Sequence, residues 1–245
     1  MPNDIGFDPS FFADLRNSEQ NHFWFRVRRK WILDIIQSIN ICGSVKVLEV
    51  GCGTGNVSSF LASHGYFVTG CEYYKEALDM AWPGFGKVQG SAIDLPFADS
   101  SFDVVCFFDV IEHFDSELPL LKEACRVLKK DGTIMIAVPA RNELWSNIDV
   151  VSFHKRRYSL KSVETLLQVS GFKPIAINYM FMLLYLPMKL LRKNQRQTQH
   201  SLRINKVINS IAGLIFDTER LASRVIKLPV GTSIIAVAKK RCNLC

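Results

Sequence analysis

A strand that ends in a glycine-rich loop and continues into a helix constrains the fold of this 245-residue chain most strongly. The β-branched and apolar residues 45–50 lead directly into Gly51, Gly53 and Gly55, and residues 56–64 then have a helical composition. Glycine adopts backbone conformations that other residues resist, and it lets the main chain lie against a ligand. Ligands of open α/β sheets bind at the carboxyl ends of the strands. We therefore expect a cofactor at this loop.

Strand and helix signals alternate along the chain from residue 45 onward. We expect strands at 45–50, 66–71, 102–108, 133–138, 172–179 and 233–240, and helices at 56–64, 75–82, 118–130 and 160–169. Such alternation predicts an α/β, doubly wound, mostly parallel sheet covered on both faces. We divide the chain into an N-terminal helical lid (1–40), a cofactor-binding core (41–179), a basic and apolar helical insertion before the last strand (180–228), and that final strand with its tail (229–245).

The spacing of the glycines discriminates between two classes of cofactor. A dinucleotide-binding loop has a third glycine three residues after the second, and that position is Asn56. Glu49, two residues before Gly51, would repel a pyrophosphate and suits a ligand with an ammonium group. Glu72 ends the second strand, where an acid can accept the ribose hydroxyls of either cofactor class.

These features resemble the class I S-adenosylmethionine-dependent methyltransferases, through residues 47–55, Glu72, and residues 92–97, 101–105 and 109–113. The resemblance implies a seven-stranded Rossmann-like sheet with an antiparallel last hairpin and S-adenosyl-L-methionine as cofactor. It implies that the glycine loop wraps the methionine end, that Glu72 holds the ribose, and that an arginine of the N-terminal helix meets the carboxylate. The implied cofactor-binding residues are Arg28, Glu49, Gly51, Cys52, Gly53, Gly55, Glu72, Tyr73, Ser91, Ala92 and Phe108.

Two of these assignments have alternatives. Arg28 belongs to a basic run that is equally typical of a solvated helix face. Ser91 stands at the adenine edge, where the family often has an acid, so its contact with the adenine amino group is expected to be weaker.

Two histidines are placed to remove a proton from an acceptor, because both follow strands at the ligand edge of the sheet. His113 ends the stretch 109–113, and His154 lies in the stretch 153–158. Histidine changes charge near neutral pH, which suits a general base. We predict that His154 and His113 are catalytic, and that Arg157 and Tyr158 bind a carboxylate or phosphate of the substrate. The alternatives are a helix-start role for His113 and an arginine pair that ties the loop to the sheet.

The net charge of +7 is concentrated in one part of the chain. No acidic residue lies between Glu164 and Asp217, whereas seven basic residues do. Residues 179–191 are almost wholly apolar and are followed by further cations. This stretch is shorter than the roughly 20 residues of a membrane span. We expect residues 179–196 to form a peripheral contact with an anionic membrane, or else to cover the substrate cavity or form a dimer contact.

The sequence therefore predicts an enzyme that methylates an oxygen of a small acceptor, such as an anionic or lipid-linked metabolite or a saccharide. The resemblance extends to bacterial methyltransferases of poorly assigned substrate and, distantly, to O-methyltransferases of quinone biosynthesis. An RNA methyltransferase and a non-catalytic cofactor-binding protein remain alternatives; we recognise no RNA-binding module and expect no nucleic-acid partner. The sequence does not indicate an oligomeric state.

Location and metal content are predicted from what the sequence lacks. The N-terminus has no basic region followed by an apolar run, and the seven cysteines are scattered, so we expect a cytoplasmic protein that can lie at the inner membrane face. Cys242 and Cys245 have no second ligand pair, and no metal site is expected.

Overall fold

The computed structural model describes residues 11–39, 44–192 and 204–241, and the structural statements below concern these residues. Seven strands form one sheet in the order β3-β2-β1-β4-β5-β7-β6. Strands β1 to β5 pair in parallel, whereas β7 runs antiparallel to both β5 and β6. The predicted seven-stranded, mostly parallel sheet with an antiparallel hairpin is confirmed. The strands are β1 (Lys46–Val50), β2 (Phe67–Glu72), β3 (Gly86–Gln89), β4 (Phe102–Phe108), β5 (Leu128–Pro139), β6 (Phe172–Met180) and β7 (Ser233–Lys240).

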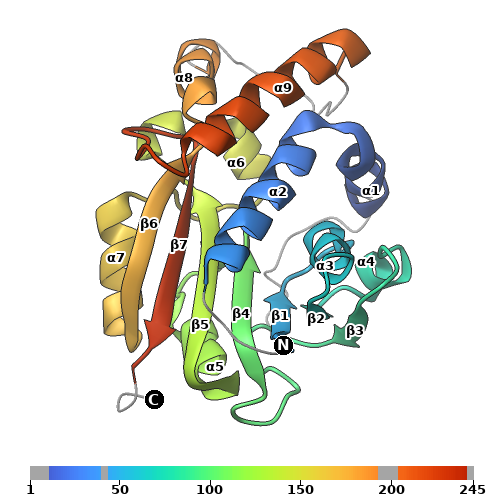
Figure 1. The fold of residues 1–245 in the computed structure, drawn as a ribbon, viewed down its shortest axis with the longest axis vertical. Helices are drawn as coiled ribbons and strands as arrows, with labels where there is room; N and C mark the ends of the chain where they lie inside the picture. The colour runs from blue at the N-terminus through green and yellow to red at the C-terminus, as the bar shows by residue number, and fades with distance from the viewer. Residues whose placement is uncertain (1–10, 40–43, 193–203, 242–245) are drawn as a thin grey trace.

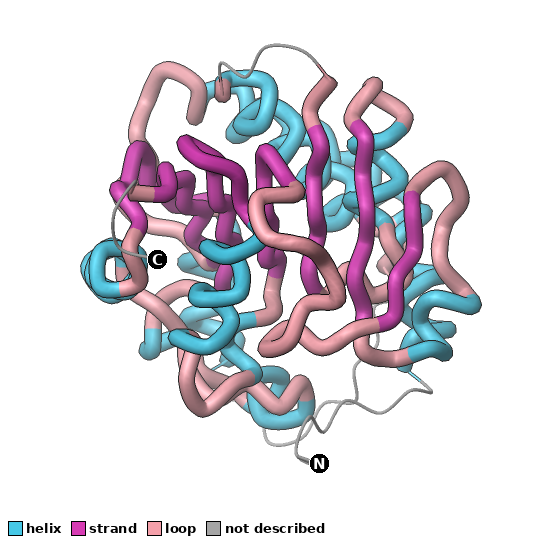
Figure 2. Tube along the Cα trace, turned by 90° about the horizontal axis from the view of Figure 1, so that it is seen from below, coloured by secondary structure: helices cyan, strands magenta, loops and turns pink. Residues whose placement is uncertain are grey.

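Helices lie above and below this layer of strands, as Figure 2 shows. The α-helices are α1 (Phe11–Asn21), α2 (Phe23–Ser38), α3 (Asn56–Ala62), α4 (Lys75–Asp79), α5 (Leu118–Val127), α6 (Asn147–Val151), α7 (Leu160–Val169), α8 (Tyr185–Arg192) and α9 (Lys206–Ala222). Three short 3-10 helices are η1 (Ile111–His113), η2 (Asn142–Leu144) and η3 (Met182–Leu184).

The centre of the core is the pair β1 and β4. Val104, Val105, Cys106 and Phe107 are completely buried, as is Leu48 on the neighbouring strand. A strand covered by helices on both faces has no solvent side, which explains why β4 lacks the alternation of apolar and polar residues. This central pair carries the glycine loop and the β4–η1 turn to the same edge of the sheet.

Two details of the secondary structure differ from the predictions. The edge strand β3 was not predicted, because Gly86, Lys87 and Gln89 give it neither an apolar pattern nor burial, and its pairing with β2 defines it. The helix expected over 118–130 ends at Val127, because Leu128 pairs with Phe102 and begins β5.

The insertion between β6 and β7 packs against the N-terminal helices (Figure 1). Lys30 Nζ of α2 lies 2.5 Å from Asp217 Oδ2 of α9, and Arg220 and Arg224 of α9 both pair with Asp34 of α2. Asn209 of α9 accepts a hydrogen bond from the amide of Phe23 at the start of α2 (2.7 Å) and donates one to the carbonyl of Asn21 (2.6 Å). Helix α9 therefore holds the junction of α1 and α2 in place.

An aromatic cluster completes this contact. The ring of Phe181, at the end of β6, lies 5.9 Å from the ring of Trp24, 5.4 Å from Trp31 and 5.8 Å from Phe216, measured between centroids. Phe181 itself has a left-handed backbone (φ +58°), which is rare for an aromatic residue. The buried contacts of its ring with α2 and α9 offset this strain.

Residues 193–196 of the predicted membrane-contact stretch, and both Cys242 and Cys245, lie outside the described residues. Within the described ranges, no helix is both long and apolar enough to cross a membrane.

Candidate cofactor and acceptor site

The glycine loop between β1 and α3 has three residues with positive φ: Gly51 (+68°), Gly53 (+53°) and Gly55 (+74°). A Cβ atom on Gly51 would lie 2.6 Å from Cγ2 of Val110, and one on Gly55 would lie 2.2 Å from Cζ of Phe85. These two glycines are therefore required by packing. A Cβ atom on Gly53 would meet nothing within 4 Å, which leaves its main chain accessible to a ligand.

Glu72, at the end of β2, braces this loop. Its carboxylate accepts hydrogen bonds from the amide of Gly53 (2.8 Å) and from the amides of Tyr73 (2.8 Å) and Tyr74 (3.1 Å). The side chain is buried, and burial raises the pKa of Glu72 although the three N–H groups oppose this shift. Glu72 thus links the glycine loop to the chain after β2.

Glu49, on β1, is the second buried acid of the site. It accepts a hydrogen bond from the hydroxyl of Ser58, and burial raises its pKa to about 7. A buried carboxyl group with this pKa is partly protonated at neutral pH, so a bound cation would favour its charged form.

A cavity of about 410 Å³ opens along the glycine loop. Eleven residues of the sequence-predicted set line it together with Glu49: Arg28, Gly51, Cys52, Gly53, Glu72, Tyr73, Ser91, Ala92, Phe108, His113 and His154. Residues from both N-terminal helices and from the loops after β4 and α6 line it as well, including Phe12, Leu15, Trp24, Phe25, Phe114 and Phe153. The cavity therefore extends from the predicted cofactor residues to the two predicted catalytic histidines.

Gly55, Arg157 and Tyr158 do not line the cavity. Gly55 begins α3 and makes room for Phe85. The expectation that Arg157 and Tyr158 bind the substrate is corrected, because both side chains are buried and engaged by protein groups. Arg157 donates to Asp149 (2.8 Å) and to the carbonyl of Ala140 (3.0 Å), and the hydroxyl of Tyr158 donates to Glu117 (2.8 Å). They tie the loop to the sheet, as the alternative interpretation stated.

Glu19 of α1 is a site residue that the sequence did not indicate. Its carboxylate accepts hydrogen bonds from Thr54 Oγ1 (2.6 Å) and Trp82 Nε1 (2.8 Å), and its side chain is buried against the cavity. The contact with Thr54 fastens the first helix to the glycine loop. No local signal marks this glutamate, because its partners lie far away in the sequence.

Arg28 of α2 also faces the cavity, where its guanidinium lies 2.7 Å from Asp109 Oδ2. Asp109 follows β4 with a left-handed backbone (φ +56°), a conformation that aspartate adopts more readily than most residues. The buried Arg28 is not part of a solvated helix face, in contrast to one of its two interpretations.

The two histidines come together in the wall of the same cavity. The rings of His113 and His154 are 4.9 Å apart, at an interplanar angle of 73°. Nδ1 of His154 lies 3.0 Å from Oδ1 of the fully buried Asp149. Burial opposes ionisation of Asp149, but the hydrogen bond with His154 and the charge of Arg157 lower its pKa to about 2. Next to an ionised carboxylate, Nδ1 carries the proton and Nε2 of His154 keeps its lone pair.

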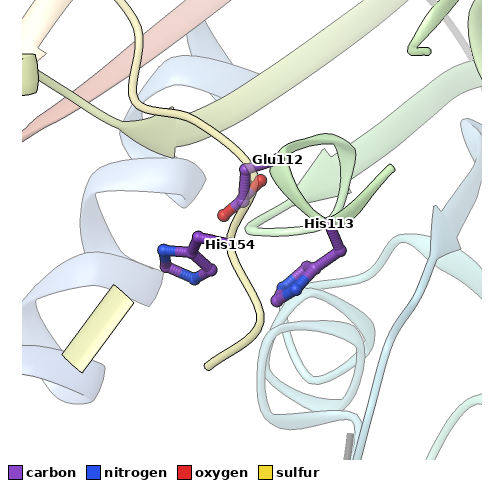
Figure 3. A group of neighbouring side chains, drawn as sticks. All are labelled: Glu112, His113 and His154. Atoms are coloured by element: carbon purple, nitrogen blue, oxygen red, sulfur yellow. The ribbon is translucent and has the colours of Figure 1, made fainter. Parts of the chain in front are cut away.

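His113 is a neutral imidazole at pH 7, because burial and the proximity of His154 lower its pKa to about 4. Phe153, beside His154, has a positive φ (+56°), which is rare for an aromatic residue and is typical of strained functional loops. Glu112 lies next to this pair, as Figure 3 shows. One ligating atom from each of Glu112, His113 and His154 lies within 4.8 Å of the others.

Comparison with known proteins agrees with this geometry. Residues 48–136 match the family model described as a methyltransferase domain. A protein of Mycobacterium tuberculosis, named as a probable S-adenosylmethionine-dependent methyltransferase, is 30% identical over 145 residues, which cover 57% of this chain and 53% of the relative. Residues 48–136 therefore belong to a methyltransferase domain, and the chain has the fold of the class I S-adenosylmethionine-dependent methyltransferases. Its cofactor is S-adenosylmethionine.

Two further proteins match this chain over different shares of its length. An O-methyltransferase of Aspergillus sclerotiorum is 35% identical over 101 residues, which cover 37% of this chain and 38% of the relative. A candidate methyltransferase of Haloferax volcanii, solved in complex with the Trm112 methyltransferase activator, superimposes with a TM-score of 0.64 at 16% identity and covers 95% of this chain and 97% of its own. The last similarity shows the fold alone. The chain spans about half the length of the mycobacterial relative.

Proposed function

We propose that this chain is an enzyme that transfers the methyl group of S-adenosylmethionine to an oxygen atom of a small acceptor. The observation that carries the proposal is one cavity lined both by Gly53, Glu49 and Glu72 and by His113 and His154. The similarity to a fungal O-methyltransferase supports oxygen as the acceptor atom.

The residues of the cavity fit the cofactor at each of its polar groups. The accessible main chain of Gly53 and the carboxylate of Glu49 suit the methionine end with its ammonium group, and Arg28 suits the carboxylate. Glu72 suits the ribose hydroxyls, while Ser91 and Ala92 lie where the adenine edge would be. The cofactor supplies an activated methyl group when it is bound. The protein then has to align the acceptor oxygen and exclude water.

Nε2 of His154 is the proposed proton acceptor. Asp149 holds Nδ1 and stabilises the imidazolium that forms when Nε2 takes the proton. In this reaction the acceptor oxygen forms a bond to the methyl carbon, the carbon–sulfur bond breaks, and the hydroxyl proton passes to His154. His113, neutral and adjacent, adds no competing positive charge.

The lining of the cavity indicates an acceptor with an apolar body. Phe12, Phe25, Phe114 and Phe153 surround the space next to the polar groups. Because Arg157 and Tyr158 are engaged elsewhere, the structural support for an anionic acceptor is lost. We therefore favour a hydroxylated aromatic or lipid-linked acceptor over a charged one.

Calorimetric titration with S-adenosylhomocysteine, with NADH as the control ligand, tests this function. We expect the first to bind and the second not to bind. Labelled methyl donor would then be used with a series of hydroxylated acceptors. Binding of NADH alone would contradict the proposed function, and cofactor binding without transfer to any acceptor would favour a non-catalytic protein.

Repeating the titration at several pH values tests the role of Glu49. The pKa of Glu49 is about 7 in the free protein, and the ammonium group of the ligand favours the charged carboxylate. Binding below pH 7 must therefore release a proton, and the Kd should fall about fivefold from pH 6 to pH 7 and about twofold from pH 7 to pH 8. Glu49→Gln should abolish this slope. An equal slope in the variant would assign the pH dependence to another group.

We also propose that α8 and α9 bind the surface of an anionic membrane. No described residue of the insertion lines the cavity, which favours a surface role for its described helices. Instead its helices expose an apolar face on the side away from α2: Leu186, Leu190, Leu191, Val207, Ile208, Ile211, Leu214 and Ile215. Lys189 and Lys206 flank this face. Such a surface suits the boundary between lipid headgroups and acyl chains.

Cosedimentation with liposomes tests the membrane contact. We expect binding to vesicles with anionic lipid at low salt and weaker binding to neutral vesicles or at high salt. Ile211→Glu with Leu214→Glu should abolish it. Val169→Glu, an equally exposed apolar position on α7, is the matched control and should bind like the parent. Failure of the parent protein to cosediment would overturn this proposal.

A further inference from the structure

The buried carboxyl group of Glu112 and the imidazoles of two cavity-lining histidines, His113 and His154, converge. Glu112 and His113 lie on η1, directly after β4, and His154 lies in the loop after α6 (Figure 3). Their ligating atoms all lie within 4.8 Å of one another. Ligands in a transition-metal site lie about 2.0–2.2 Å from the ion, and hence about 3–3.5 Å apart. Small rotations of the side chains would bring the three groups to that spacing.

Glu112 supplies an independent reason to expect a ligand here. Its side chain is fully buried, and within the described residues neither carboxylate oxygen has a hydrogen-bond partner. Burying a carboxyl group without a hydrogen-bond partner costs free energy of folding. In folded proteins such a group normally pairs with a hydrogen-bond donor, a water molecule or an ion. The imidazoles of His113 and His154 are the kind of ligand that accompanies a carboxylate on a transition-metal ion.

The surroundings of His154 match the second layer of groups around a metal. Metal-binding histidines usually donate their other ring N–H to a carboxylate, which fixes the tautomer and the ring orientation. Asp149 occupies this position beside Nδ1 of His154, at 3.0 Å, and is itself fully buried. Nε2 is thereby the free ligating atom.

The local charges also favour a cation. Three carboxyl groups, those of Asp109, Glu112 and Asp149, face this region, whereas Arg28 and Arg157 each compensate one of them. The remaining negative charge is that of Glu112 when it is ionised. A divalent ion at this point would balance it with one positive charge in excess, available to an acceptor oxygen.

We propose that Glu112, His113 and His154 bind one divalent transition-metal ion, such as Mn²⁺ or Zn²⁺, with open positions for the acceptor oxygen. The binding of the ion does not depend on the proposed function, whereas the role of the ion in methyl transfer rests on that function. The ion binds the hydroxyl of the acceptor and lowers its pKa. The proton leaves the metal-bound hydroxyl for water, the oxygen bonds to the methyl carbon, and the carbon–sulfur bond breaks. In the metal-bound enzyme the ion thus replaces His154 as the activator of the hydroxyl.

Calorimetric titration of the metal-stripped full chain with MnCl₂ and ZnCl₂ tests the site. Cys242 and Cys245 are first replaced by serine, because thiol groups are themselves zinc ligands and would complicate the titration. We expect one ion per chain. The nearly isosteric Glu112→Gln and the variant His154→Ala should each weaken binding at least tenfold, and Asp149→Asn should weaken it about 10–100-fold. His64→Ala, an exposed histidine on the far side of α3, is the control. Absence of binding, or unchanged affinity in Glu112→Gln, would overturn the proposal.

Methyl transfer measured with and without a chelator separates this inference from the proposed function. If the ion activates the acceptor, chelation lowers the rate as far as His154→Ala does, and added Mn²⁺ restores it only in the parent. A rate that chelation leaves unchanged would overturn the catalytic role of the ion and leave the methyltransferase function intact. An ion that binds to a chain without transferase activity would overturn the function and leave the metal site intact.

Discussion

Replacing His154 by alanine should lower kcat for methyl transfer by about 10²–10⁴-fold, the usual contribution of a general base or of an equivalent activating group. The affinity for S-adenosylhomocysteine should stay within about twofold of the parent, because His154 is not among the proposed cofactor-binding residues and only the transfer step needs it. Initial rates with labelled donor and calorimetry with S-adenosylhomocysteine measure the two quantities.

The control for this variant is His64→Ala, because His64 is exposed and remote from the cavity. Thermal unfolding of each variant shows whether the fold is retained, since the side chain of His154 also contacts the buried Asp149. Unchanged kcat in both His154→Ala and the double variant with His113→Ala would remove the histidine pair from the reaction.

Replacing Glu72 by alanine should weaken binding of S-adenosylhomocysteine by at least about 10²-fold. Hydrogen bonds to a charged group contribute about 1.5–3 kcal/mol each, and two ribose hydroxyls would lose their acceptor. The amides of Gly53, Tyr73 and Tyr74 would also lose theirs, so the glycine loop would no longer be braced. The affinity is measured by calorimetry.

Glu76→Ala is the matched control for Glu72, because Glu76 is an exposed acid four residues further along the same connection. Glu72→Gln should be intermediate, since an amide oxygen can still accept from Gly53 while its NH₂ group cannot accept from the other two amides. A Glu72→Ala protein that binds within threefold of the parent would show that the cofactor does not use this carboxylate.

The predictions that held depend on local chemistry. The glycine loop, the acid at the end of β2 and the alternation of strands and helices lie within short stretches, where backbone preference and burial pattern act directly. Strand β3 lacks such a local pattern. It is defined by its pairing with β2, so the sequence did not predict it.

The predictions that failed depend on the direction of side chains. The run of residues 153–158 has the same composition whether its cations face a substrate or the protein interior. Asp149 and Glu117 decide between these two orientations, because a carboxylate of the protein interior holds a nearby arginine or tyrosine more strongly than solvent does. Only the packed loop brings these acids to Arg157 and Tyr158.

By itself, the sequence determined the fold class, the cofactor class and the edge of the sheet that carries the glycine loop, because those follow from periodicity and from glycine and acid at fixed spacing. The tertiary structure decided that Glu19 fastens the first helix to the glycine loop, that α9 packs against α2, and that His154 meets Glu112 and His113. These contacts join residues that are distant along the chain, and no local pattern encodes them because their free energy exists only once the core has packed.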